Sequence, residues 1–241
     1  MAQHQELKRK GDVLEQLEKH GTPPPLSIEV PKMCDLPNKS EPWPSDDWLP
    51  VDILLLTVED CEFLGCYAFM KNPFKSYRKD LGYVYFGNMG ESESEPLKVA
   101  LMKCCEGSIG PGGSQMVTKN AVMQLRPKVV YSVGYCESLK PCTARLGDVV
   151  ISSNLSTQAF RTPVGKDIRN LIQHSRDGWN PPLRIPNARK VNVHRDGEIL
   201  SGVGPPSAKL SCVSNSNATA VESEGEGWPY FCFKSDILFV G

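Results

Sequence analysis

A continuous apolar run over residues 51–58 constrains the fold of this chain more than any other stretch. Its letters, VDILLLTV, show no alternation of polar and apolar side chains. A run of this length is a strand, and the absence of alternation predicts that both of its faces are buried. Residues 128–134 form a second run of the same kind. Strands buried on both faces are typical of a parallel sheet that helices cover on its two sides.

The segments around these two runs predict an alternation of strands and helices. Alternating or apolar segments indicate further strands, and the spacing of apolar residues indicates helices between them. The strands are expected over 81–89, 97–103, 147–153 and 190–194, and the helices over 59–71, 114–125 and 164–174. This order predicts an α/β fold of three layers, with a mixed, largely parallel central sheet and helices on both faces.

The N-terminal part has a different character. Apolar residues at helical spacing among charges predict a short amphipathic helix over residues 5–20, and a proline-rich stretch follows it up to Pro50. We therefore expect two parts: residues 1–47 as a helix with an extended lead-in, and residues 48–241 as the folded domain.

Composition excludes several classes of function. The 241 residues carry a net charge of -1, so nothing draws the chain to nucleic acid or to an anionic membrane. No apolar run approaches the roughly 20 residues of a membrane-spanning helix, and the first residues lack the apolar core of a secretory signal. The nine cysteines do not follow the spacing of a metal site. We expect a cytoplasmic protein with reduced thiols and no metal.

Two loops leave alternatives open. The glycine-rich loop over residues 107–114 lies between a predicted strand and a helix, where backbone N–H groups can bind an anion. It matches neither common phosphate-binding pattern, and tight turns use glycine for steric reasons alone, so a plain turn and an anion cradle are equally compatible with it. Glu137, in the loop after the strand over 128–134, is either a ligand contact or a solvated turn residue, and the second is favoured.

Five segments in a fixed order carry a resemblance to a known family. They are DILLLTVEDCEF from residue 52, IGPGGSQMVTKNAVMQLRPKVVYSVGYCESL from residue 109, LGDVVIS from residue 146, VNVHRDGEILSG from residue 191 and AVESEGEG from residue 220. In this order the chain resembles the superfamily of nucleoside phosphorylases and nucleosidases, over roughly residues 51–228. The family includes purine nucleoside and uridine phosphorylases and the methylthioadenosine/adenosylhomocysteine nucleosidases.

The resemblance implies roles for carboxylates. Cleavage of a nucleoside builds positive charge on the ribose, and a carboxylate that binds the 2′ and 3′ hydroxyls favours that transition state. The second Glu of the family motif V-E-M-E has this role and corresponds to Glu224, with Glu222 as the first Glu and Ser223 in place of Met. Glu62 matches the Glu that helps orient the attacking water in the nucleosidases. The alternative to this role is that Glu62 is an ordinary acid in the first turn of a helix, favoured by the helix dipole.

The resemblance also implies substrate contacts at the ends of two other strands. These are Gly134, Tyr135 and Cys136 after one strand, and Ile199 in the segment that the family uses to stack on the base. Cys136, Glu137 and Ser138 stand where the family has Ala-Gly-Gly, which narrows and charges the pocket, and the segment around Ile199 lacks the aromatic residue of the family. Thr57 stands near a glycine that binds phosphate in some phosphorylases, which favours a nucleosidase-like site.

The end of the chain departs from the family pattern. After V-E-M-E the family has a helix, a strand and an Asp that donates a proton toward the purine base. Here Trp228-Pro229 breaks the helix, and Asp236 is too close to Glu224 for the family arrangement, so it is not assigned this role. The domain therefore resembles the family with an incomplete C-terminal end.

Two functions of different classes follow. The first is an enzyme of nucleoside metabolism that cleaves the N-glycosidic bond of a nucleoside, purine being favoured, with phosphate or water. The second is a catalytically inactive relative that binds nucleosides or serves as an interaction module, with the helix over residues 5–20 as its docking element. Either takes a small-molecule nucleoside and needs no cofactor, with inorganic phosphate as an optional co-substrate. Family sites often include residues of a neighbouring subunit, so a homo-oligomer is compatible with both.

Overall fold

The computed structural model describes the chain in segments. These are residues 24–90, 92, 94–107, 111–140, 142–156, 161–174, 180–186, 188–201, 218–222 and 236–240. The predicted helix over residues 5–20 lies outside them. No helix of the described segments is long and apolar enough to cross a membrane.

The chain divides into two units. The smaller unit joins the N-terminal residues up to Glu29 with residues 180–190. Within it, a β-bridge joins Leu26 to Leu183, and the N–H of Ser27 donates to the carbonyl of Pro182 at 2.8 Å. The larger unit contains every helix and strand that the structure names.

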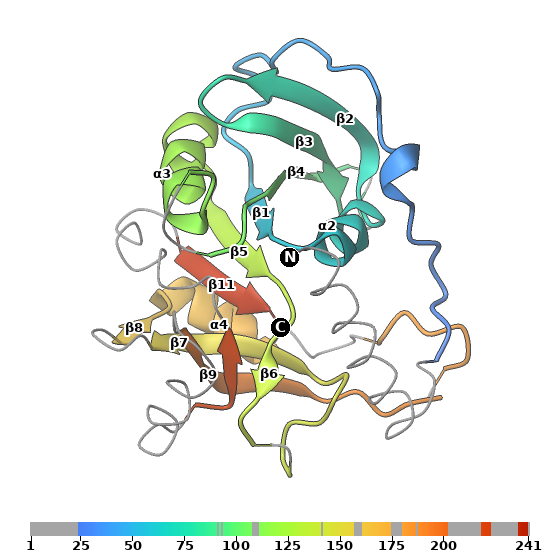
Figure 1. Ribbon diagram of the computed structural model, residues 1–241, viewed down its shortest axis with the longest axis vertical. Coiled ribbons are helices and arrows are strands. Elements are labelled where there is room, and N and C mark those ends of the chain that lie inside the picture. Colours follow the sequence, from blue (N-terminus) through green and yellow to red (C-terminus); the bar gives the residue numbers. More distant parts are fainter. Residues whose placement is uncertain are drawn as a thin grey trace, which may run out of the picture. The chain divides into compact units, whose positions relative to one another are not determined.

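The larger unit is built on one mixed sheet (Figure 1). Four neighbouring strands in its middle run parallel, in the order β4, β1, β5 and β11. On one side the strands β3 and β2 continue antiparallel, and on the other side β11 meets β7 in antiparallel pairing. Strands β9 and β10 then run parallel to β7, and β6 closes the order in antiparallel pairing with β10.

The bounds of the elements are as follows. The strands are β1 Ile53–Thr57, β2 Lys71–Arg78, β3 Gly82–Met89, β4 Leu97–Lys103, β5 Val129–Val133, β6 Glu137–Ser138, β7 Val149–Ser156, β8 Arg161–Pro163, β9 Val193–Ser201, β10 Ala220–Glu222 and β11 Asp236–Val240. The helices are η1 Met33–Asp35, α2 Asp60–Tyr67, α3 Ser114–Leu125 and α4 Lys166–His174.

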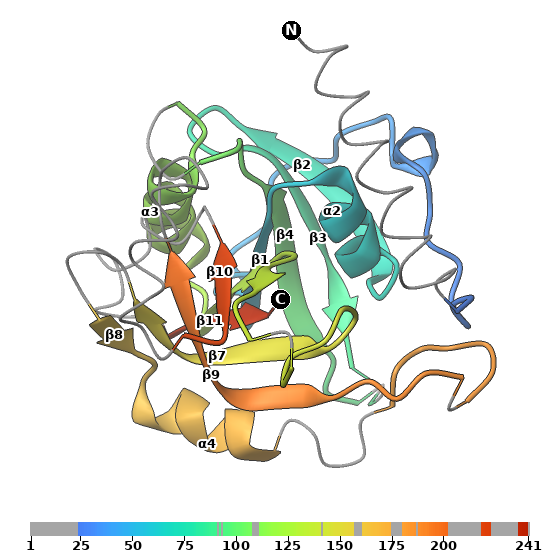
Figure 2. The same cartoon turned by 60° about the horizontal axis from the view of Figure 1, so that its bottom comes forward.

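One apolar cluster, here called the inner cluster, determines how the sheet curves. It joins residues from both arms of the sheet, including Phe86 of β3 and Ala220 of β10, with Leu54 and Leu56 of β1 between them. Because the two arms share one cluster, the sheet curls around it (Figure 2). The full set is Val51, Leu54, Leu56, Val84, Phe86, Ala100, Met102, Cys104, Ala121, Leu125, Val130, Val150, Ile199 and Ala220.

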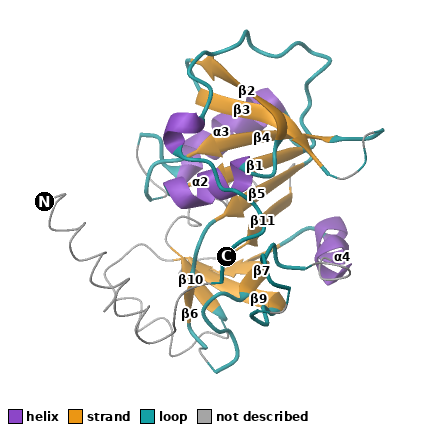
Figure 3. Ribbon diagram, turned by 90° about the vertical axis from the view of Figure 1, so that its right-hand side faces the viewer, coloured by secondary structure: helices purple, strands orange, loops and turns teal. Residues whose placement is uncertain are grey.

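Helices cover both faces of the sheet, as predicted (Figure 3). Helix α3 places Ala121 and Leu125 in the inner cluster. Helix α2 packs Phe63 against Leu55 on the opposite face, where α4 packs Ile168 against Ile151 further along the sheet. The alternation of Leu54, Leu55 and Leu56 between the two faces explains why the run in β1 has no polar position.

Most of the predicted elements are confirmed, and their ends differ by a few residues. Strand β4 and helix α3 have the predicted bounds, and β1, β3, β5 and α4 lie within theirs. Strand β9 extends to Ser201, so the segment expected to stack on a base lies in a strand. The short strands β6, β8, β10 and β11 are not predicted, because two to five residues are too few for a periodic pattern. Strand β11 shows that a strand does follow the acidic segment.

The prediction of a helix over residues 59–71 is wrong at its end. Helix α2 stops at Tyr67, and strand β2 begins at Lys71. The pair Asn72-Pro73, interpreted as a helix stop, lies at a register shift in β2. Proline lacks an N–H to donate to a neighbouring strand. The strand tolerates Pro73 because β2 is the edge strand of the sheet and the register shift takes Pro73 out of the hydrogen-bonded pairs.

The lead-in before β1 contributes to the core. Trp43 and Trp48 pack against the inner cluster, and both rings meet Phe86 edge to face at centroid distances of 5.4 and 5.7 Å. Leu36 packs on the opposite face beside Leu55 and Phe63. The boundary between residues 47 and 48 stays a prediction.

We predict that Phe86→Ala lowers the free energy of unfolding by about 3–5 kcal/mol, because the ring is fully buried among Trp43, Trp48 and Phe74 and its loss leaves a cavity. Urea denaturation measures the effect. The matched control is Phe69→Ala, whose ring is 51% exposed, with an expected change within about 0.5 kcal/mol. Equal losses for the two variants would contradict the assignment of this core.

Candidate active site

The carboxyl ends of three parallel strands lie at the same edge of the sheet. Strands β4, β1 and β5 are neighbours in parallel register, so the residues that follow them come together there. Val58 and Glu59 follow β1, Cys104 and Cys105 follow β4, and Gly134 follows β5. In open α/β sheets, ligands bind at this edge.

Glu62 joins two of these strand ends. Its Oε2 accepts hydrogen bonds from the backbone N–H groups of Val58 at 2.9 Å and Glu59 at 2.8 Å, just after β1. Its Oε1 accepts from the backbone N–H of Tyr135 at 3.1 Å, just after β5. The bond to Glu59 is the capping-box interaction at the N-terminus of α2. Glu62 is therefore also an ordinary first-turn helix acid, which was the alternative to a role in the site. The bond to Tyr135 goes beyond helix capping, since residues 62 and 135 are far apart in the chain.

Gly134 lies closely against this carboxylate. A Cβ at residue 134 would lie 3.0 Å from Oε1 of Glu62, so a larger residue would require the carboxylate to shift. The glycine therefore lets the end of β5 approach the carboxylate. Tyr135, the next residue, keeps its side chain 67% exposed at this edge.

Strands β6 and β10 bring the acidic segment toward the same place. Ser138 pairs with Ala220, and Glu137 pairs with Val221, in antiparallel register. As β10 runs on to Glu222, its backbone therefore approaches Cys136, which precedes β6 and follows the end of β5. The structure thus brings the backbone of Glu222 to the edge that holds Glu62. Ser223 and Glu224 lie outside the described residues, and the assignment of Glu224 to ribose stays a prediction.

The remaining predicted residues are placed as follows. Ile199 of β9 is 1% exposed and lies in the inner cluster, paired with Ala220. Its role as a base contact stays a prediction. Glu137 is exposed in β6, in agreement with the favoured solvated position. The backbone of Asp236 pairs with Val129 at the start of β5, the edge opposite Glu62, which supports leaving it without the role of acid.

The electrostatics around Glu62 disfavour an added anion. Lys103, at the end of β4, forms an ion pair with Asp60 in the first turn of α2. The Thr57 hydroxyl is buried and donates to the carbonyl of Met102 at 3.4 Å, on the neighbouring strand. One helical turn after Glu62, burial and, to a smaller extent, the negative charge of Glu62 together raise the pKa of the Cys66 thiol to about 12. Cys66 is therefore a neutral thiol at neutral pH.

The glycine-rich loop is described at both of its ends only. The N–H of Cys105 donates to the carbonyl of Gly112 at 2.8 Å, and the N–H of Ser114 donates to the carbonyl of Gly107 at 3.2 Å. Gly112 has a φ of 78°, and a Cβ there would lie 2.7 Å from the Cys105 sulfur, so this position requires glycine for steric reasons. The choice between a plain turn and an anion cradle stays open.

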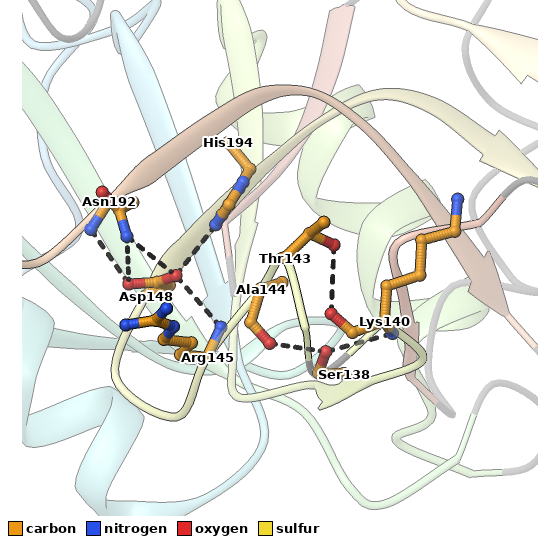
Figure 4. A network of polar contacts seen from close by, with 8 residues as sticks. All are labelled: Ser138, Lys140, Thr143, Ala144, Arg145, Asp148, Asn192 and His194. Carbon is orange, nitrogen blue, oxygen red and sulfur yellow. Dashed lines mark hydrogen bonds and ion pairs between the residues drawn. The ribbon is translucent and has the colours of Figure 1, made fainter.

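A second polar cluster, which no sequence motif indicates, lies at the amino ends of β7 and β9 (Figure 4). The side chain of Asp148 is 4% exposed and accepts from the backbone N–H groups of Arg145 at 3.0 Å and Asn192 at 2.9 Å. Nε2 of His194 lies 3.0 Å from its Oδ2. Burial alone would raise the pKa of Asp148, but the donors from Arg145, His194 and Asn192 together lower it to about 2. The pairs Gly147-Asp148 and Val193-His194, each just at a strand start, are the only signal in the sequence.

The loop between β6 and β7 is held by its own hydrogen bonds. The Ser138 hydroxyl donates to the carbonyl of Ala144 at 2.8 Å, and the Thr143 hydroxyl donates to the carbonyl of Lys140 at 3.1 Å (Figure 4). Together with Asp148, these bonds connect the strand that pairs with β10 to the start of β7. Ser138 therefore stabilises a turn, where the family has glycine.

No three His, Cys, Asp or Glu side chains gather closely enough to hold a metal ion within the part of the chain that the structure describes.

Comparisons with known proteins agree with this arrangement. No protein-family model matches the chain, and no curated protein matches it. Among solved structures, a 5′-methylthioadenosine/S-adenosylhomocysteine nucleosidase from Colwellia psychrerythraea 34H in complex with adenine has a TM-score of 0.64 at 12% identity, over 79% of this chain and 81% of that chain. The nucleosidase from Neisseria meningitidis in complex with methylthio-immucillin-A has a TM-score of 0.60 at 13% identity, over 78% and 83%.

A further match is the futalosine hydrolase of Helicobacter pylori strain 26695, with a TM-score of 0.61 at 14% identity over 79% of this chain and 83% of that chain. The chain has the nucleoside phosphorylase and nucleosidase fold. At these identities the likeness establishes the fold and not the reaction.

We predict that Asp148→Asn lowers the free energy of unfolding by about 1–2 kcal/mol at pH 7. Because the folded pKa is depressed from 3.8 to about 2, the ionised carboxylate stabilises the fold above about pH 4, and this contribution is lost as the pH falls toward 2. Denaturation curves of parent and variant between pH 7 and pH 2 should therefore converge at the acid end.

The control for this prediction is Asp80→Asn, in the exposed turn between β2 and β3. Its difference from the parent should stay near zero over the whole pH range. A constant difference for Asp148→Asn down to pH 2 would show that the carboxylate charge is not what holds the two strand starts.

Proposed function

We propose that this chain cleaves the N-glycosidic bond of a purine nucleoside with water as the acceptor. The observation that carries the proposal is the hydrogen bonding of Glu62, which holds a carboxylate on three backbone N–H groups between the ends of β1 and β5. The fold supports the class of reaction, since the similar structures are nucleosidases and a hydrolase, and one of them holds adenine.

The geometry favours water over phosphate. The N–H groups of Val58 and Glu59 are the backbone donors that an incoming anion would use at this turn, and the Glu62 carboxylate already accepts from both. A phosphate would meet that negative charge, while the ammonium of Lys103 is paired with Asp60. A neutral water molecule meets no such repulsion.

Glu62 can orient that water. An ionised carboxylate has about four acceptor sites, and three of those of Glu62 are taken by fixed backbone donors. The remaining acceptor can receive an O–H of a water molecule that faces C1′ of the ribose. The donors hold the carboxylate in place before the substrate arrives, so no reorganisation is needed in the transition state.

The reaction balances as a hydrolysis. The C1′–N bond breaks and its electron pair leaves with the base, the water oxygen bonds to C1′, and a proton of the water passes toward Glu62 while the base takes up one proton. Glu222 and Glu224, at the end of β10 and after it, are the proposed ribose contacts. Gly134, Tyr135 and Cys136 are proposed to border the substrate, with Ile199 near the base.

Turnover is expected to be slow. The family uses an Asp to protonate the leaving base, and no residue of this chain is assigned that role. A general acid contributes about 10²–10⁴-fold to a rate, so we expect kcat to fall below typical enzyme values by about that factor.

The first test is the release of base from inosine, adenosine and methylthioadenosine, followed by chromatography with and without phosphate. We expect slow release at equal rates in both conditions. Release that depends on phosphate would refute water as the acceptor. Release at ordinary enzyme rates would refute the inference that the chain lacks a general acid for the leaving base. Nucleoside binding without release would favour the alternative, an inactive binding module.

We predict that Glu62→Gln lowers kcat by at least about 10²-fold with a small change in KM, because the amide keeps the size but presents an N–H to the water and to the backbone donors. The matched control is Glu95→Gln, an exposed acid just before β4, with an unchanged kcat. Equal rates for the parent and Glu62→Gln would refute the role of this carboxylate.

We predict that Glu224→Ala weakens nucleoside binding about tenfold or more, because a charge-assisted contact to the ribose hydroxyls is lost. Isothermal titration with adenosine measures it, and Glu226→Ala, two positions further on, serves as the control with unchanged affinity. A Glu224→Ala variant that binds like the parent would remove Glu224 from the site.

A further inference from the structure

Two tyrosine rings lie side by side on the surface of strands β2 and β3. Tyr77 and Tyr83 are opposite each other in the antiparallel register, and their ring centroids are 5.2 Å apart. Their exposed fractions are 55% and 56%. In every other ring pair of the described residues, at least one ring is buried or half-buried. Single exposed aromatic side chains are common, whereas adjoining ones indicate a surface that binds a partner.

The alternation of side chains along β2 shows on which face of the sheet this pair lies. Phe74 packs against the inner cluster, so Lys75 and Tyr77 lie on the opposite face. Helix α2 covers part of that face, where the ring of Phe63 meets Tyr85 at a centroid distance of 5.1 Å. The tyrosine pair extends beyond this cover and remains exposed.

A cation adjoins the two rings. Nζ of Lys75 lies 5.0 Å from the centroid of the Tyr83 ring, which is a cation–π contact. The same ammonium donates to the carbonyl of Asn38 at 3.4 Å, so its contacts with described residues include no carboxylate. We call Lys75, Tyr77 and Tyr83 the tyrosine patch. It presents two apolar ring faces beside a positive charge.

The strand that carries the tyrosine patch is basic. Residues 71–79, KNPFKSYRK, contain four cations and no acid, although the net charge of the whole chain is -1. The ion pairs of the described residues include none of these four cations. A surface of this charge attracts an acidic partner and repels a basic one.

We propose that the tyrosine patch is a docking surface for an acidic peptide segment of a protein partner. Lys75 and Tyr77 are two positions apart on one strand, about 7 Å, and an extended peptide spaces its alternate side chains by the same distance. A segment lying along β2 therefore places one carboxylate at Lys75 and, two positions later, an apolar side chain on the two rings. A second acid, two positions further on, can pair with Lys79.

The other contacts of β2 favour a peptide over single-stranded nucleic acid, which also combines with aromatic and basic side chains. Nζ of Lys71 donates to the carbonyl of Gly90 at 2.8 Å, and the guanidinium of Arg78 lies over the Trp43 ring at 5.1 Å. Two cations of the strand therefore remain for a ligand at the patch. Two separate carboxylates need no more, whereas a phosphate backbone is bound by a longer row of cations.

The experiment measures fluorescence anisotropy of labelled peptides with the full chain. The acidic probe has the core Glu-Thr-Phe-Thr-Glu between Gly-Ser flanks, and two control probes have the cores Lys-Thr-Phe-Thr-Lys and Glu-Thr-Ser-Thr-Glu. We expect the acidic probe to bind with a Kd below about 1 mM, at least about tenfold more tightly than either control, and more weakly as salt is added. Equal binding of the three probes, or no binding of the acidic probe, would overturn the proposal.

Substitutions of the rings test the apolar contact. We expect Tyr77→Ala and Tyr83→Ala each to weaken binding of the acidic probe about fivefold or more, because a central tyrosine contributes strongly to an interface. The matched control is Phe69→Ala, which removes a ring that is 51% exposed just before β2 and should leave the affinity unchanged. A loss as large for Phe69→Ala as for the tyrosine variants would show that the patch is not the docking surface.

A charge reversal gives a readout that a folding defect does not imitate. Lys75→Glu should weaken the acidic probe about tenfold or more, and it should bind a probe with the core Lys-Thr-Phe-Thr-Glu more tightly than the parent does. The control is Lys119→Glu, an exposed position in α3, with unchanged affinity for both probes. A Lys75→Glu variant with the same preference as the parent would refute the contact between Lys75 and a carboxylate, and the proposal with it.

Two further ligands and an activity measurement complete the test. Binding of oligothymidylate, or of vesicles containing phosphatidylserine, more tightly than the acidic probe would overturn a peptide as the occupant. Base release from nucleosides should be the same in Tyr77→Ala as in the parent, because Tyr77 has no part in the candidate site. The inference does not rest on the proposed function, so either can fail while the other stands.

Discussion

The packing of both arms of the sheet on one apolar cluster is the constraint on which the rest of the molecule depends. Phe86 and Ala220 lie at distant positions in the strand order, and they meet in the inner cluster only because the sheet curls. The same curvature carries β10 along β6 toward the end of β5. A flat sheet would leave the acidic segment remote from Glu62. Burial of apolar surface therefore assembles the candidate site, and no contact within the site needs to do so.

Within that frame, one carboxylate is held by the backbone of two strand ends. Glu62 caps α2 and also accepts from Tyr135, so it fixes the end of β5 relative to the end of β1. The structural role of Glu62 as a helix cap is therefore compatible with its proposed role in catalysis. The donors that make Glu62 a good helix cap also hold its charge in place, occupy the turn against other anions, and leave one acceptor for water.

Sequence periodicity predicts the large elements of this fold well, because β1, β4, β5 and α3 bury wide apolar faces. It does not predict β6 or β10, whose two or three residues pair only because the curved sheet presents an edge to them. Pro73 leads to the wrong prediction of a helix end for a similar reason, because it lies in strand β2 at a register shift, where its missing N–H costs no strand pairing. The resemblance points to Glu62 and to the acidic segment, but not to Asp148 or His194. The contact of these two depends on which strands are neighbours, and a single sequence does not contain that information.

The central claim is that a water molecule, oriented at Glu62, attacks the ribose of a nucleoside. The most direct measurement is mass spectrometry of the sugar produced from adenosine in water enriched in heavy oxygen, with phosphate present. We expect free ribose that carries one heavy oxygen from the solvent in each molecule formed, and a loss of this product in Glu62→Gln. Ribose phosphate as the product, or a heavy-oxygen product formed equally well by Glu62→Gln, would contradict it.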